Sequence, residues 1–158
     1  MRLTRLTMVA LAAVALAVAE GKQVSAQSGN LVATPAKPAR IVVPAPSLVS
    51  SGVFLDVGVR AYAPPRGGAV QAVVTVSAGA HDTEQEIGRF TVFPNEPFSA
   101  DDVRQERIFR LDATAALAAL KSSGGPLEVK VRLAPLDPSV SSSDASLTVG
   151  QVVFQPRP

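Results

Sequence analysis

The sequence of 158 residues contains 15 basic and 13 acidic residues, one histidine and no cysteine. The absence of cysteine excludes disulfide bonds, thiolate metal sites and cysteine nucleophiles, and a single histidine excludes a histidine-rich catalytic zinc centre. Counted from residue 27 onwards, basic and acidic residues balance at twelve each, so the chain lacks the basic footprint of a nucleic-acid-binding protein.

The N-terminal residues have the three-part pattern of a secretory signal peptide. Arg2 and Arg5 precede an apolar run, Met8–Ala19, and Val24 and Ala26 supply the small residues of a peptidase site. The run of twelve residues is shorter than the ~20 that a membrane-spanning helix needs. We expect residues 1–26 to be removed after Ala26, or alternatively after Ala19, with no stable membrane insertion afterwards. The protein is then exported, to the periplasm or the extracellular space. An uncleaved N-terminal anchor is the alternative.

Residues 27–51 form a segment rich in proline and alanine. Pro35, Pro38, Pro44 and Pro46 fix φ and remove backbone donors, which favours an extended chain over sheet or helix. The pattern predicts a linker or N-terminal arm, in which residues 41–43 could pair briefly as an edge strand.

From residue 52 to residue 158 the pattern is that of one β-domain. Apolar and polar residues alternate with period 2, which is typical of half-buried strands, and Gly- or Pro-rich turns separate the runs. Six strands are expected, at residues 53–62, 70–77, 87–93, 106–111, 127–133 and 147–154.

One short helix is expected at about residues 113–121. Ala115–Lys121 are mostly strong helix formers, and Leu117 and Leu120 share one face. Asp112 or Thr114 can cap its N-terminus, and Gly124 and Gly125 end it.

Together the elements predict an all-β, antiparallel two-sheet sandwich of six to seven strands with one short helix. Eight side chains are expected in its core: Val74, Val76, Phe90, Val92, Leu117, Val129, Val131 and Val152.

The sequence offers little catalytic chemistry. His81 lies in a polar loop with Asp82, Glu84 and Glu86, a set that suits at most a weak oxygen-dominated cation site, and a solvated hairpin loop is the simpler interpretation. No G-x-S-x-G motif is present, and Arg66-Gly67-Gly68 lacks the residues of a phosphate loop. We expect no catalytic residues, no metal site and no cofactor, so the protein is predicted not to be an enzyme.

Two aromatic residues are candidates for contact with a partner. Phe98 lies between Pro97 and Ser99 in a loop, residues 94–104, that is longer than a simple hairpin needs. Long loops on rigid scaffolds often carry function, although a loop phenylalanine also commonly pins its own loop to the core. Tyr62, the only tyrosine, is the second candidate, and its simpler interpretation is a half-buried aromatic at a strand edge.

The serial order of these segments resembles the C-terminal β-sandwich domain of plant polyphenol oxidases and related tyrosinases. The matching stretches are Leu55–Arg60, Ala72–Val76, Glu86–Pro94, Arg110–Leu117, Leu127–Pro135 and Leu147–Phe154. The sequence departs from the signature of that domain, because Ala72-Val73-Val74-Thr75 stands in place of Lys-Phe-Asp-Val. It also lacks the copper domain and its six histidines.

The resemblance implies a role as well as a fold. In that family the domain packs over the copper site, aids folding and blocks the substrate until it is removed. It therefore implies that this protein is a non-catalytic accessory module that covers, or assists the maturation of, a separately encoded tyrosinase-like copper oxidase. The alternative is a structural or adhesive envelope module that binds an unrelated partner.

Overall fold

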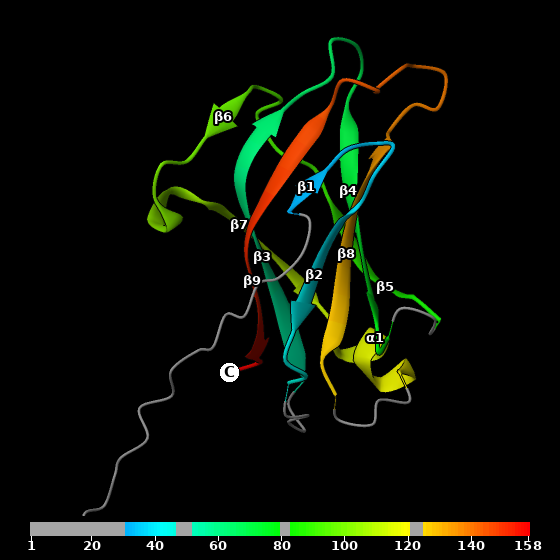
Figure 1. Cartoon of the computed structure of the whole chain (residues 1–158), viewed down its shortest axis with the longest axis vertical. Coiled ribbons are helices and arrows are strands. Elements are labelled where there is room, and N and C mark those ends of the chain that lie inside the picture. The colour runs from blue at the N-terminus through cyan, green and yellow to red at the C-terminus, as the bar shows by residue number, and fades with distance from the viewer. Residues whose placement is uncertain (1–30, 47–51, 80–82, 121–124) are drawn as a thin grey trace, which may run out of the picture.

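The protein is a sandwich of two antiparallel sheets, as the sequence predicts (Figure 1). The computed structural model describes residues 31–46, 52–79, 83–120 and 125–158. The five-stranded sheet contains β1 (Val32–Ala33), β3 (Val53–Ala63), β6 (Phe98–Ser99), β7 (Arg107–Asp112) and β9 (Ser146–Pro156). The four-stranded sheet, in the order β2-β8-β4-β5, contains β2 (Ala39–Val43), β4 (Val70–Ser77), β5 (Gln85–Phe90) and β8 (Leu127–Pro135).

The described residues hold nine strands, more than the six to seven expected. The three additional strands are β1, β2 and β6. Two of them come from the segment 27–51, for which the sequence predicts a linker or arm, and the third comes from the loop 94–104.

Residues 31–46 are part of the sandwich. β1 pairs with β9 and β2 pairs with β8, so the segment contributes an edge strand to each sheet, joined by a turn in which Thr34 and Lys37 exchange backbone hydrogen bonds. The expected edge strand at 41–43 is confirmed and extends back to Ala39. Ile41 is completely buried, because β2 lies between prolines rather than across them and its alternating apolar residues can face the core.

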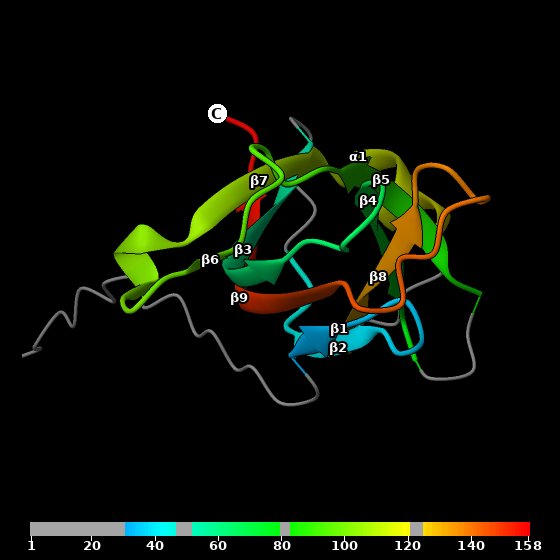
Figure 2. The same ribbon diagram turned by 90° about the horizontal axis from the view of Figure 1, so that it is seen from above.

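The core lies between the two sheets. All eight predicted core side chains are buried except Phe90, which is partly buried and packs against the core. Along one side of the sandwich Phe90 of β5 stacks on Phe109 of β7, with 4.1 Å between the ring centroids. Figure 2 shows β1 and β2 on the side of the sandwich away from β5 and β7. The gap between the two sheets is therefore covered at both of its long edges.

The short helix α1 (Thr114–Ala119) covers one end of the sandwich beside β5, and residues 121–124, where its expected C-terminus falls, lie outside the described residues (Figure 1). Its N-cap residue is Ala113, which makes no capping side-chain bond. Of the two predicted caps, Asp112 accepts the backbone N–H of Thr114 at 3.0 Å, whereas the Thr114 hydroxyl accepts the N–H of Val53 at 3.0 Å. The helix is therefore tied to β3 rather than capped in isolation.

Candidate interaction surfaces

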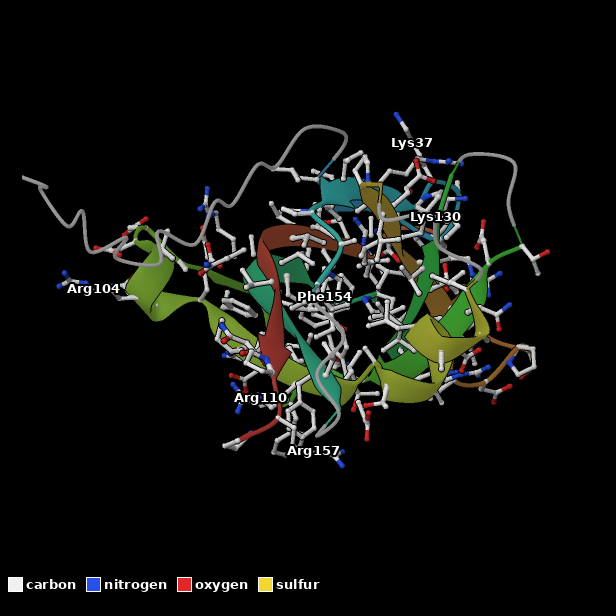
Figure 3. All side chains as sticks on the ribbon, turned by 90° about the horizontal axis from the view of Figure 1, so that it is seen from below. Lys37, Arg104, Arg110, Lys130, Phe154 and Arg157 are labelled. Carbon is white, nitrogen blue, oxygen red and sulfur yellow. The ribbon has the colours of Figure 1, made fainter. Side chains whose placement is uncertain are left out.

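Residues 91–106 cross from β5 in one sheet to β7 in the other and form a projection on one side of the sandwich. The crossing contains β6 and a 3₁₀ turn, η1 (Val103–Gln105), which stand out from one side of the sandwich in Figures 1 and 2. Arg104 lies at the far end of this projection and points away from the sheets (Figure 3).

Both predicted contact residues lie where the crossing meets the sandwich. Tyr62 of β3 and Phe98 of β6 are direct partners in the strand register, so the structure brings them together. Tyr62 is 3% exposed, and its hydroxyl donates to Asn95 Oδ1 at 2.8 Å. Burial raises the pKa of the Tyr62 phenol above its ordinary value.

Tyr62 reaches the core because of a bulge that the alternation of the sequence does not reveal. Period 2 places Tyr62 on the same face as Asp56, Gly58 and Arg60. In the structure the register with β9 shifts between Val59 and Ala61, which adds one residue to β3 and reverses the alternation beyond it. Tyr62 then joins Leu147 in the core.

Phe98 is held from both sides. It is partly buried and packs against the core, and the guanidinium of Arg107 lies 4.0 Å from the centre of its ring. Such a cation–π contact stabilises the loop by about 0.5–2 kcal/mol. The geometry therefore gives Phe98 and Tyr62 a supporting position at the base of the projection.

A buried carboxylate fixes the other end of the crossing. The side chain of Glu106 is fully buried and accepts two hydrogen bonds from Arg60, at 3.1 and 3.0 Å, and one from the backbone N–H of Gln151 at 2.9 Å. β9 bulges at this point, between the partners of Val57 and Val59. Because a bulge interrupts the regular ladder, the carboxylate supplies an acceptor to a backbone donor there.

The projection also carries exposed apolar side chains. Phe93 is 86% exposed and Val103 is about half exposed, and Ile108 of β7, just after the projection, is also about half exposed. The carbonyl of Phe93 accepts a hydrogen bond from Arg107 Nη1 at 3.2 Å, so the backbone below its ring is held in place. Sequence reasoning missed Phe93 because it placed the residue in the expected strand 87–93. In the structure β5 ends at Phe90, and Phe93 lies in the loop beyond it, where Val92 faces the core and Phe93 is exposed.

A second surface is a charged groove on the outer face of the four-stranded sheet. Its volume is about 300 Å³, and its lining residues are Pro38, Arg40, Thr75, Glu84, Lys130 and Arg132. Lys130 bonds to Glu84 and to Glu128, and Arg40 bonds to Glu128 at 3.1 Å. The contact with Lys130 holds the pKa of the Glu84 carboxyl below its ordinary value, and the pKa of Lys130 is raised in return.

Of the loop considered for a cation, Glu84 and Glu86 are described, and His81 and Asp82 lie outside the described residues. Glu84 is engaged by Lys130 and Glu86 by Arg89. In residues 31–46, 52–79, 83–120 and 125–158 no three His, Cys, Asp or Glu side chains gather where they could hold a metal ion. In the same ranges no helix has the length and apolarity to cross a membrane.

Neither a scan against models of known protein families nor a search of curated proteins finds a match to this chain. The resemblance to the polyphenol oxidase domain therefore stays a prediction.

Proposed function

We propose that this protein is a non-catalytic, exported accessory module that docks onto a partner protein through the projection of residues 91–106. The observation that carries this proposal is the exposure of Phe93 on a backbone that Arg107 holds in place. A large apolar side chain presented on a fixed backbone loses little entropy on binding, and aromatic anchors of this kind contribute much of the affinity of protein interfaces.

The partner that we propose is a tyrosinase-like copper oxidase encoded separately. The support comes from the resemblance of the sequence and from the chemistry of the site, since a phenylalanine ring matches a phenolic substrate in shape and apolarity. In this proposal Phe93 carries the contact, and Phe98 and Tyr62 hold the projection from below.

The test is co-production with a tyrosinase-like oxidase from the same source, followed by affinity measurement and an assay of diphenol oxidation. We expect a complex, and we expect Phe93→Ala to weaken it at least about 30-fold, the effect of losing a central aromatic anchor. Leu136→Ala is the matched control, because Leu136 is also an exposed apolar residue, at 53%, but lies outside the projection.

The outcomes separate the two parts of the proposal. Failure to bind any such oxidase removes the partner. A complex that Phe93→Ala and Leu136→Ala affect equally keeps the partner but removes the docking surface.

The second candidate function is a structural or adhesive envelope module. The charged groove favours it, because its lining includes Arg132, a cation without a salt bridge among the described residues, and such a position suits an anionic component of the envelope.

A further inference from the structure

The charged groove is built from neighbouring strands in register. Arg40 of β2 lies directly opposite Lys130 of β8, and Lys130 lies opposite Thr75 of β4. Side chains that are direct partners across strands project from the same face about 5 Å apart. The three side chains therefore form one row across the outer face of the sheet.

Lys130 lies at the bottom of the groove. Only 11% of its side chain is exposed, compared with 50% for Arg40. A buried ammonium needs anionic partners, because burial without them costs several kcal/mol. Glu128 on the same strand is one of them, at 3.2 Å.

The other partner of Lys130 comes from outside the sheet. Glu84 precedes β5 and reaches back across β4, where one carboxylate oxygen contacts Lys130 and the other accepts the Thr75 hydroxyl at 3.0 Å. An ammonium and a hydroxyl thus bind the two oxygens of one carboxylate. Glu84 occupies the groove as a carboxylate ligand would.

One cation of the groove is not used by this arrangement. Arg132 lies two residues beyond Lys130 on the same face of β8, about 7 Å along the strand. Arg89 and, after it, Arg132 lower the pKa of the Glu86 carboxyl, but Glu86 forms its ion pair with Arg89. No carboxylate of the described part of the chain lies within salt-bridge distance of the Arg132 guanidinium. The groove therefore combines a filled carboxylate position with an adjacent cationic position.

We propose that this groove binds a polycarboxylate, one carboxylate replacing Glu84 at Lys130 and Thr75 and a second pairing with Arg132. Glu84 is then an internal competitor, which lowers the affinity for the ligand and excludes singly charged anions that cannot also engage Arg132. The chemistry is shared by small polycarboxylates and by chains of acidic sugars, whose carboxylates repeat along a polymer.

Calorimetric titration of the purified protein with citrate and with trigalacturonate, at constant ionic strength, tests the proposal. We expect both the wild-type protein and the variants to stay folded, since Glu84 is 44% exposed and Arg132 is an exposed residue. Glu84→Gln should tighten binding by about tenfold and Arg132→Gln should weaken it by about tenfold, each equivalent to about 1.4 kcal/mol.

Arg66→Gln is the matched control, because the side chain of Arg66 is 98% exposed and lies outside the groove; it should change nothing. Binding of citrate assigns the site to small molecules as well as polymers, and binding of trigalacturonate alone assigns it to polymers. The proposal is overturned if neither probe binds the Glu84→Gln variant at about 10 mM, or if Arg132→Gln and Arg66→Gln have the same effect.

Discussion

The buried carboxylate of Glu106 fits between β3 and β9 because each strand has a glycine where it lies. Its side chain occupies the space that side chains at Gly58 and Gly150 would fill, since a Cβ at either position would overlap the carboxylate. The two glycines thus make room for the group that anchors the crossing from β5 to β7. Neither glycine has a positive φ, so close approach rather than backbone freedom is the reason for glycine here.

This contact predicts the effect of a single methyl group. Gly150→Ala should lower the free energy of unfolding by about 1–3 kcal/mol, the range for overpacking a well-packed site. Urea denaturation measures it as a lower midpoint at an unchanged m-value. Gly125→Ala is the control, because among the described residues no atom other than those of its chain neighbours lies within 4 Å of the added Cβ, and stability should change little. Equal effects of the two substitutions would contradict the anchoring role of Glu106.

At the scale of elements, β2 decides whether the proline-rich segment belongs to the domain. Its outward residues, Arg40 and Val42, are exposed, and its inward residues, Ala39, Ile41 and Val43, are buried. The pairing with β8 covers an edge of the four-stranded sheet that would otherwise expose a row of backbone donors and acceptors.

Two neighbouring substitutions on β2 separate a strand from a linker. Ile41→Ala should lower the free energy of unfolding by about 2–5 kcal/mol, because it leaves a cavity in the core. Val42→Ala, on the outer face of the same strand, should cost less than about 1 kcal/mol. Thermal or denaturant unfolding checks both, and a small, equal cost would mean that the segment does not contribute to the core in solution.

At the scale of the whole molecule, ion pairs and hydrogen bonds make stability depend on pH. The folded-state pKa values of Glu84, Glu86, Asp112 and Asp137 all lie below their ordinary values. The main causes are the contact with Lys130 for Glu84, Arg89 for Glu86, Thr114 for Asp112 and Ser139 for Asp137. Each group stabilises the fold fully above its unfolded pKa of about 4, and this stabilisation is lost as the pH falls through the lower folded value.

We therefore expect the free energy of unfolding to be nearly constant from about pH 6 to 8 and to decrease as the pH is lowered below about 5. Lys130 has a raised pKa, so its contribution is present at neutral pH and is lost only when the pH rises above about 10. Denaturation at a series of pH values tests this, and Glu84→Gln should flatten the acid limb. Stability that rises on acidification would contradict the assigned directions of these shifts.

The period-2 pattern of the sequence determined the sandwich, its six main strands and most of its core, because alternation reports directly which face of a strand is buried. The helix-forming residues Ala115–Lys121 located the helix, and the prolines within residues 94–104 marked the long loop with Phe98. The partner, the localisation and the catalytic inactivity remain predictions from the sequence.

Other features depended on contacts between distant residues. The bulge that turns Tyr62 inwards arises from the pairing of β3 with β9, and Phe98 is covered by Arg107 from the next strand along the chain. The exposure of Phe93 depends on how residues 91–106 leave the four-stranded sheet. The contact of Glu84 with Lys130 depends on the pairing of β5 with β4 and of β4 with β8. Alternation gives the face of each residue within its strand, but which strands pair, and where their register shifts, is decided only when the two sheets pack together.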